Sequence, residues 1–457
     1  MIVMKFGGTS VENAKAIERA AAIVKGRLEQ QPLVVVSAMA KVTDQLLAMA
    51  RAAGSGDRKT ALKLCRALQE RHYNTAGELL GTALFTEFHS DLAADFENLE
   101  ELLRGISAVG ELTPRTTDYV AAFGEMLSSK IVTAAFAALG LASALVDSRD
   151  CIVTDSTHMR AAPLFEETNG RLQARVAPLL AAGKVPVMGG FIGSSKAGIT
   201  TTIGRGGSDY SAAIIGAGLD AGRIEIWTDV DGMMTTDPNL CADARRIKVI
   251  SFDEAAELAY FGAKVLHPAT VLPAVQKNIP VYVLNSRNPG CEGTRISARA
   301  PRCRNSFKAI AVKKRITIVD VAAPRMQLAH GFLRGIFEAF DRHAVAVDVV
   351  STSEVSVSLT VDSTESIPAL AADLAKLADV KYEGRKAIVC LVGENLRETP
   401  GIAARVFGEL ADVKIRMISQ GASEINLTFV IEEDVVPEVV RRLHKAFFSD
   451  LDTEVFA

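Results

Sequence analysis

The first 36 residues show a strand pattern, a helix pattern and a second strand pattern, and this order constrains the fold more than any other feature. Residues 2–6 form a short apolar run that ends at a pair of glycines. A helical spacing of apolar residues follows over about 11–28, and a second apolar run lies at 33–36. This order is a βαβ unit, whose two strands are parallel. We therefore expect an α/β fold whose ligands bind at the carboxyl ends of the strands.

Further segments extend this unit into a first domain. Residues 43–139 are rich in helical patterns, and a helix is expected at 171–182. Apolar runs typical of buried strands lie at 144–147, 152–154, 185–188, 224–228 and 281–284.

The stretch 200–211 reads TTTIGRGGSDYS and precedes a helix-favouring run. Its glycines allow the main chain to approach a ligand closely, and the following helix N-terminus favours an anion. Arg205 suits bidentate capture of a carboxylate or phosphate. Taken alone, such a stretch is more often a solvated glycine-rich loop than a binding site. Other polar residues at predicted strand ends, such as Lys5 and Ser37, favour the binding-site interpretation.

The composition excludes several classes of protein. The formal charge of −3 argues against broad binding to nucleic acid or to an anionic membrane. Six scattered cysteines form no CxxC pair, which argues against disulfides and structural zinc and suggests a reducing, cytoplasmic location. No apolar run has the roughly 18–20 residues that a membrane span needs. The start of the chain does not have the shape of a signal peptide.

The last third of the chain repeats itself. The segment 331–357 matches 401–427, and each copy shows the order strand, helix, strand, strand, helix, strand. We expect strands of the first copy near 316–321, 345–350, 355–361 and 380–383, and of the second near 388–392, 413–418, 425–431 and 453–456. A βαββαβ unit forms a four-stranded antiparallel sheet with two helices on one face. Two such units indicate ligand sensing or a purely structural pairing role.

The predicted strand ends of the first domain carry chemistry suited to phosphoryl transfer. Lysines, an arginine, glycine-rich turns and carboxylates supply positioning and charge stabilisation, which this reaction mainly needs. No GxxxxGK[ST] P-loop, protein-kinase signature, GxSxG elbow or metal-ligand spacing of histidines occurs.

Four motifs in this order resemble aspartate kinases of the amino acid kinase family: KFGGTSV at 5–11, GRGGSDY at 204–210, WTDVDG at 227–232 and FGAKVLHP at 261–268. The tandem repeat resembles the two ACT domains of these enzymes. The resemblance implies a three-layer α/β/α amino-acid-kinase catalytic domain at 1–295, a linker at 296–312, and ACT domains at 313–385 and 386–457. The monofunctional, lysine-sensitive class is the nearest in pattern.

The resemblance also implies roles for residues of the first domain. ATP and L-aspartate would be the substrates, with Mg²⁺ carried mainly by the ATP phosphates and no dedicated protein metal site. Catalysis would depend on Lys5, beside the transferred phosphoryl group, and on Asp209, which would orient it. The aspartate-binding residues would be Ser37, Thr43, Glu125, Phe191, Arg205 and Ser208. Besides Lys5, the nucleotide would contact Gly7, Gly8, Gly207, Thr228, Asp229, Met234, Asn239 and Lys264. Met234 and Asn239 replace an aromatic residue and an arginine that are usual in the family, so nucleotide contacts there should differ.

In the repeats, the resemblance implies feedback inhibition by L-lysine, in a homodimer or homotetramer joined through the ACT domains. The effector residues would be Met326, Phe332, Leu333, Val347, Asp348, Thr352, Ser353 and Glu354. L-threonine is the alternative effector. Two alternative functions stay open: a related kinase that acts on glutamate or acetylglutamate, and a non-catalytic amino-acid sensor with the same fold.

Overall fold

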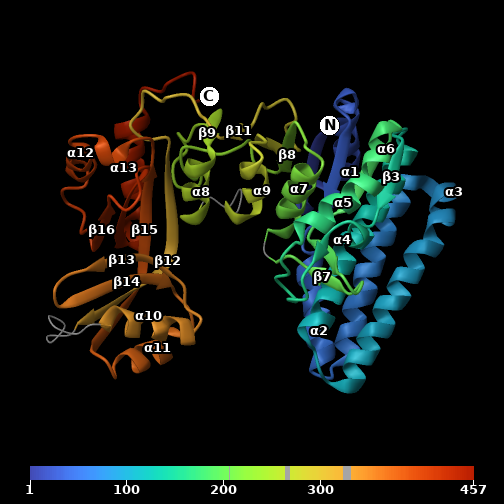
Figure 1. Ribbon diagram of the computed structural model, residues 1–457, viewed down its shortest axis with the longest axis horizontal. Coiled ribbons are helices and arrows are strands. Elements are labelled where there is room, and N and C mark those ends of the chain that lie inside the picture. The colour runs from blue at the N-terminus through green and yellow to red at the C-terminus, as the bar shows by residue number, and fades with distance from the viewer. Residues whose placement is uncertain (205, 263–267, 323–330) are drawn as a thin grey trace. The chain divides into compact units, whose positions relative to one another are not determined.

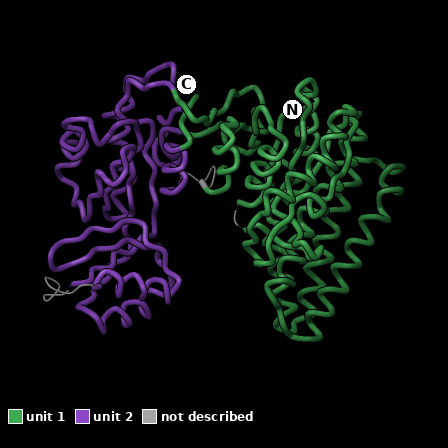
Figure 2. The backbone as a smooth tube through the Cα atoms, viewed as in Figure 1, with its two compact units in different colours: residues 1–233, 248–252, 265–300 green, residues 234–247, 253–264, 301–457 purple. Residues whose placement is uncertain are grey.

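The computed structural model describes residues 1–204, 206–262, 268–322 and 331–457. The chain divides into two units, which Figure 2 colours separately. The first contains residues 1–233, 248–252 and 265–300, and the second contains residues 234–247, 253–264 and 301–457.

An eight-stranded sheet forms the centre of the first unit (Figure 1), in the order β3-β5-β2-β1-β8-β10-β11-β9. Strand β1 pairs in parallel with β2 and β8, as the βαβ pattern predicts, and β11 runs antiparallel to β10. The strands are β1 (Ile2–Phe6), β2 (Pro32–Val36), β3 (Ser143–Val146), β5 (Val185–Gly189), β8 (Arg223–Thr228), β9 (Val249–Ser251), β10 (Val281–Asn285) and β11 (Thr294–Ser297).

Helices cover the sheet of the first unit. Helix α4 packs on β2, β3 and β5, and α7 packs on β1, β2 and β8. The helices are α1 (Ala14–Lys25), α2 (Val42–Gly54), α3 (Arg58–Val109), α4 (Pro114–Ala138), α5 (Phe165–Arg175), α6 (Ala177–Ala181), α7 (Gly207–Gly218) and α9 (Leu272–Gln276). Helix α3 consists of two helical segments that meet at Gly81, whose φ is 65°. Short 3₁₀ helices lie at Gly8–Ser10, Leu28–Gln30, Ser148–Asp150 and Pro268–Val271.

The first unit also contains a separate, small three-stranded sheet. It is formed by β4 (Val153–Thr154), β6 (Ile192–Ser195) and β7 (Thr200–Thr202), in the order β4-β6-β7. The hairpin of β6 and β7 was not predicted, because its short strands are rich in Gly, Ser and Thr and lack a clear apolar run.

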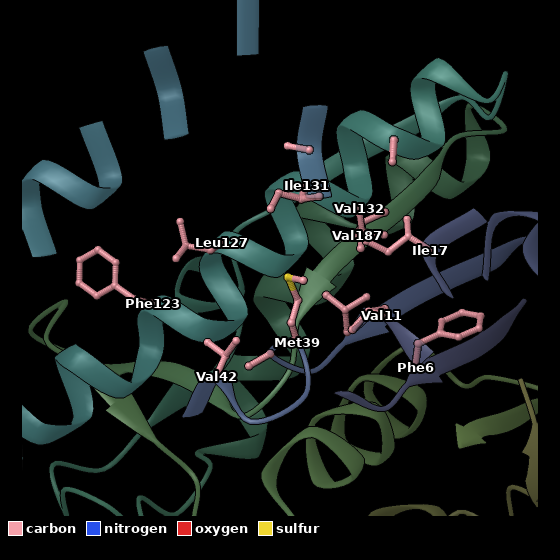
Figure 3. Close-up of a cluster of buried hydrophobic side chains, with 14 of the residues drawn as sticks. Phe6, Val11, Ile17, Met39, Val42, Phe123, Leu127, Ile131, Val132 and Val187 are labelled. Atoms are coloured by element: carbon pink, nitrogen blue, oxygen red, sulfur yellow. The ribbon is translucent and has the colours of Figure 1, made fainter. Parts of the chain in front are cut away.

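A continuous apolar core joins β1 and β2 to the helices on one face of the main sheet. Figure 3 shows Phe6 and Val11 near the β1 end of this core, with Leu127 and Ile131 on α4 and Val187 on β5. Burial of such side chains contributes roughly 1.5–3 kcal/mol each to folding.

Helix α4 is long and apolar enough, by length and composition alone, to cross a membrane, and is the one such helix among the described residues. However, 72% of its most apolar stretch is buried inside the protein. It packs on α2, α3 and the four strands β2, β3, β5 and β7, so its apolar character is explained by its place in the core.

The second unit contains a single six-stranded sheet in the order β13-β14-β12-β15-β17-β16. Its strands are β12 (Ala309–Ala322), β13 (Val347–Thr352), β14 (Ser356–Asp362), β15 (Asp379–Val392), β16 (Met417–Gln420) and β17 (Asn426–Glu432). Its helices are α8 (Phe252–Tyr260, which begins in the first unit), α10 (Phe332–Arg342), α11 (Ile367–Leu374), α12 (Ile402–Gly408) and α13 (Val436–Phe448), with 3₁₀ turns at Leu396–Glu398 and Glu433–Val435.

The two repeats share strands β12 and β15. Residues 316–322 of β12 pair with β14 and with residues 379–386 of β15, which completes the first repeat. Residues 309–313 of β12 pair instead with residues 388–392 of β15, beside β17. The second repeat therefore takes its outer strand from residues that precede the first repeat, four of which (309–312) had been assigned to the linker.

The predicted strand at 453–456 was wrong. Among these residues only Phe456 forms a bridge, an isolated one with Ile247, and the segment is otherwise a turn. The edge of the second repeat that this strand would have covered is paired with residues 309–313. The local pattern could not reveal this, because the pairing joins residues far apart in the chain.

A buried ionic cluster attaches α8 to the sheet of the second unit. Lys308 Nζ lies 3.0 Å from Glu254 Oε2 and 2.7 Å from Glu394 Oε1, and the side chains of Lys308 and Glu254 are each 1% exposed. Burial alone would lower the pKa of Lys308, but the two carboxylates outweigh it and hold that pKa above its ordinary value.

Candidate active site

Lys5 and Asp209 form an ion pair at the carboxyl end of β1. Met4 and Phe6 belong to the apolar core on one face of the sheet, so Lys5, between them, points to the opposite face. There its Nζ lies 2.6 Å from Asp209 Oδ1 in the first turn of α7. Both side chains are largely buried, and a buried ammonium is stabilised when a carboxylate pairs with it. The two predicted catalytic residues are thus in direct contact.

The first turn of α7 lies against the connection between β5 and β6. Gly206 caps the helix with a φ of 72°, a conformation that glycine adopts without strain. A Cβ on Gly190 would lie 2.7 Å from the Cα of Ser208, so only glycine allows this close approach. The helix N-terminus and Lys5 together create a positive region that suits the phosphates of a nucleotide.

Glu125 is a buried carboxylate on α4 with one oxygen available to a ligand. Its Oε1 accepts a hydrogen bond from the N–H of Ala38 at 3.1 Å. Its Oε2 is buried and has no hydrogen-bond partner among the described residues. Burial raises the pKa of Glu125 to about 8, although the Ala38 N–H and the charge of Lys5 act in the opposite direction. A cationic ligand group would stabilise the charged form.

A cavity of about 490 Å³ contains the Lys5–Asp209 pair and Glu125. It is large enough for a small amino acid and part of a nucleotide. Phe191 lines it with a φ of 64°, a conformation that non-glycine residues adopt mainly where function or packing requires it. The structure brings together these predicted site residues around the cavity: Lys5, Gly8, Ser37, Thr43, Glu125, Phe191, Gly207, Ser208 and Asp209.

Several cavity residues were not predicted from the sequence, and Asp118 is the most informative of them. Asp118 lies seven residues before Glu125 on α4, a spacing of two helical turns that places both carboxylates on one face. The sequence contains that spacing, but a helix has both buried and exposed faces, and only the folded structure shows that the face with Asp118 and Glu125 lines the cavity. Other cavity residues that were not predicted include Lys41, Asp44, Met159 and Thr202.

Two glycines predicted to offer N–H groups to phosphates already use them within the protein. Gly7 N–H donates to Trp227 O and Gly207 N–H donates to Gly204 O, each at 3.0 Å. In this conformation neither group is directed at a ligand, so nucleotide binding through them requires an exchange of partners.

The other predicted nucleotide residues are spread over both units. Thr228 ends β8 and its hydroxyl lies 3.3 Å from the carboxylate of the exposed Asp229. Met234 and Asn239 belong to the second unit, where Asn239 bonds to Asp237. Arg205 and Lys264 lie outside the described residues.

The predicted effector residues that the structure describes lie at the start of α10 and along β13, the edge strand of the sheet in the first repeat. Phe332 and Leu333 begin α10, Val347 to Thr352 form β13, and Ser353 and Glu354 follow in the turn to β14. The Ser353 hydroxyl accepts a hydrogen bond from Ser356 N–H at 3.1 Å, so it already closes its own turn. Met326 lies outside the described residues.

Asp348, one of the predicted effector residues, already has a protein ammonium beside it. Lys313 Nζ lies 2.8 Å from both carboxylate oxygens of Asp348, whose side chain is 4% exposed. Tyr260, at the end of α8, donates its hydroxyl to the same carboxylate at 3.0 Å. Burial and the Asp348 charge raise the pKa of Tyr260 to about 12, so the phenol keeps its proton. An amino-acid ammonium would have to displace or share this carboxylate.

Comparison with known proteins identifies the family. Residues 1–285 match the amino acid kinase family, and residues 389–447 match an ACT domain. The chain is 36% identical to the lysine-sensitive aspartokinase 3 of Escherichia coli over 462 residues, which cover 98% of this chain and 99% of that protein. It is also 36% identical to the chloroplastic aspartokinase 2 of Arabidopsis thaliana over 464 residues, which cover 98% of this chain and 84% of the relative.

Solved structures agree with these relatives. Two crystal structures of E. coli aspartokinase III, one with aspartate and ADP in the R-state and one with lysine and aspartate in the T-state, each superpose with a TM-score of 0.85. Each is 35% identical in sequence, and the match covers 98% of this chain and 100% of that one. With the amino acid kinase fold, the ACT repeat and near full-length similarity established, the chain belongs to the aspartokinases of the amino acid kinase family.

Proposed function

We propose that this protein is an aspartate kinase, which transfers the γ-phosphoryl group of ATP to the β-carboxylate of L-aspartate and so produces an acyl phosphate. The observation that carries the proposal is the single cavity that holds the Lys5–Asp209 ion pair and the free oxygen of Glu125. The relatives named as aspartokinases, and the E. coli structure with aspartate and ADP, support the same reaction.

The residues of the cavity fit an electrostatic mechanism. Lys5 would neutralise charge on the oxygens of the transferred phosphoryl group, and Asp209 would fix the position of the Lys5 ammonium. The attacking β-carboxylate of aspartate is ionised at neutral pH, because a carboxyl of this type has a pKa of about 3.9. The reaction therefore needs no general base, and the chain supplies position and charge.

Glu125 would hold the α-ammonium of the acceptor through its free Oε2. Ser37, Thr43 and Ser208, which line the same cavity, would bond the acceptor's carboxylates, and Phe191 would close its apolar side. Mg²⁺, when bound, would be carried by the ATP phosphates with few ligands from the protein, and it would offset their negative charge.

The first experiment measures ADP release with Mg-ATP and L-aspartate, and traps the acyl phosphate with hydroxylamine. Aspartate-dependent ADP release with one equivalent of hydroxamate supports the proposal. Comparable turnover with glutamate or acetylglutamate would identify a different acceptor. No turnover with any acceptor would favour a sensor that retains the fold.

We also infer that L-lysine inhibits the enzyme through the first repeat and that the repeats join the chain into a homodimer or homotetramer. Support comes from the lysine-bound E. coli relative and from the predicted effector residues, which lie on α10, on β13 and in the β13–β14 turn of the first repeat. An effector that binds one quaternary arrangement more tightly shifts the population toward it.

Two measurements test this regulation. Isothermal titration with lysine and with threonine decides the effector, and absence of heat with lysine would contradict the assignment. Light scattering of the full-length protein, with and without lysine, measures the oligomer, and a monomer in both conditions would contradict the proposed assembly.

A further inference from the structure

Asp118 is a buried carboxylate at the cavity whose hydrogen bonds all come from the protein. Thr202 Oγ1 donates to Oδ1 at 2.5 Å, and His158 Nδ1 lies 2.7 Å from Oδ2. The N–H of Met159 lies 3.0 Å from both oxygens. Asp118 is only 1% exposed. A carboxylate accepts about four hydrogen bonds, so these four contacts leave Asp118 little capacity for a ligand.

Glu125 provides a contrast on the same helix face. Both carboxylates line the cavity and both are buried, but Glu125 keeps a buried oxygen without a partner among the described residues, whereas both oxygens of Asp118 are bonded. Glu125 is therefore suited to bind a ligand, and Asp118 is suited to hold protein segments in place.

Two segments converge on Asp118. One is the end of β7, through Thr202, which leads directly into Gly204 and the first turn of α7. The other is the turn at 155–161, which contains Met159 in a left-handed conformation with a φ of 67°. This conformation is strained for a non-glycine residue, and the two contacts from Met159 N–H to Asp118 help to offset the strain.

The turn and the strand end also contact each other. Ala161 N–H donates to Thr202 O at 2.9 Å, and a Cβ on Gly204 would lie only 3.3 Å from Met159 O. Met159 and Thr202 both line the cavity. The position of this cavity wall therefore depends on the Asp118 carboxylate.

We infer that Asp118 is a positioning residue. Through Thr202 and Met159 it holds one wall of the cavity, formed by the end of β7 and the 155–161 turn, in a fixed position relative to α4. The position of this wall in turn sets the geometry in which the acceptor binds to Glu125. The inference rests on the proposed function for the identity of the acceptor. Because both oxygens of Asp118 are bonded to protein groups, Asp118 acts through Thr202 and Met159.

The test compares three variants of the full-length protein. Asp118→Ala removes the carboxylate, and Thr202→Val removes one of its donors. Thr201→Val is the matched control. Thr201 lies on the same strand as Thr202, and its hydroxyl makes a buried hydrogen bond of 2.7 Å with Thr154, but Thr201 does not line the cavity.

A displaced wall should raise the KM for aspartate about tenfold or more in Asp118→Ala and about threefold in Thr202→Val, with the KM for ATP within about twofold. Thr201→Val should lower the melting temperature comparably to Thr202→Val with both KM values unchanged.

Two further readouts separate positioning from general destabilisation. Asp118→Asn should recover much of the aspartate KM, because its Oδ1 can accept from Met159 and Thr202, and its amide can donate to His158 Nδ1 in the ring tautomer that leaves this nitrogen without a proton. Hydrogen exchange at the amides of Met159 and Ala161 should be faster in Asp118→Ala and unchanged in Thr201→Val.

The outcomes distinguish this inference from the proposed function. Equal increases in the KM for aspartate and the KM for ATP, or an aspartate KM that follows the melting temperature across all variants, would overturn the positioning role. Unchanged hydrogen exchange in Asp118→Ala would also overturn it. If the wild-type protein does not phosphorylate aspartate but Asp118→Ala accelerates exchange in the 155–161 turn, the proposed function fails and the positioning role stands.

Discussion

The raised pKa of Glu125 predicts how aspartate binding depends on pH. Burial holds that pKa at about 8, so at pH 6 about 1% of the empty sites carry an ionised Glu125, compared with about half at pH 8. Because the acceptor's ammonium pairs with the ionised form, kcat/KM for aspartate should rise about 50-fold from pH 6 to pH 8. ADP release measured directly at each pH, without coupling enzymes, gives this profile.

The same pKa fixes the sign of a stability change. A carboxyl whose folded pKa exceeds its unfolded value of 4.5 stabilises the fold fully below pH 4.5, and that contribution is lost as the pH rises to about 8. In the absence of substrate, the wild type should lose about 2 kcal/mol of unfolding free energy between pH 6 and pH 8 relative to Glu125→Gln, since each pH unit in this window is worth about 1.4 kcal/mol.

Glu125→Gln is the control for both measurements. Its amide oxygen can still accept from Ala38 N–H, but the side chain does not titrate, so its kcat/KM for aspartate should be low and nearly independent of pH. A wild-type kcat/KM that changes less than about threefold between pH 6 and pH 8 would refute the reasoning, because it would mean that Glu125 is already ionised in the empty site.

Three further changes test other parts of the structure. Lys5→Ala should lower kcat about 100- to 1000-fold with the circular dichroism spectrum unchanged, and a kcat within about tenfold of the wild type would remove Lys5 from its catalytic role. Lys313→Met leaves the Asp348 carboxylate bonded to Tyr260 but without an ammonium partner, so lysine should inhibit at lower concentration. The exposed neighbour is the control, because Lys314→Met should have no effect. Weaker inhibition in Lys313→Met would show that the Lys313–Asp348 pair assists the effector. Lys308→Met leaves the carboxylates of Glu254 and Glu394 without their buried ammonium, so hydrogen exchange of β12 and β15 should show that the free energy of unfolding falls by about 3–5 kcal/mol. Exchange equal to that of the wild type would contradict this stabilising role.

The parallel sheet of the first unit was predictable because its central strands are buried on both faces. Such strands appear in the sequence as short continuous apolar runs, and those at 2–6, 33–36, 185–188, 224–228 and 281–284 all correspond to strands. The β6–β7 hairpin and the strands β9 and β11 are short and carry no such run, so they were missed.

The candidate site was predictable where a residue type and a strand end coincide. Lys5 and Asp209 meet because the carboxyl end of β1 faces the first turn of α7, a geometry that any parallel βαβ sheet repeats. Asp118 was not predictable in the same way, because a carboxylate inside a helix is usually solvated and its partners come from two distant segments. The internal hydrogen bonds of Gly7 and Gly207 are likewise a property of the folded backbone alone.

The strand shared between the two repeats has a consequence for synthesis on the ribosome. Residues 309–313 are made before the first repeat, but their partners at 388–392 are made about 80 residues later, roughly 4 to 16 seconds at ordinary elongation rates. During that interval this apolar strand has an unpaired edge, which is the kind of surface that chaperones bind and that initiates aggregation. Slower translation between the two repeats should therefore lower the yield of correctly folded protein, and faster translation should raise it.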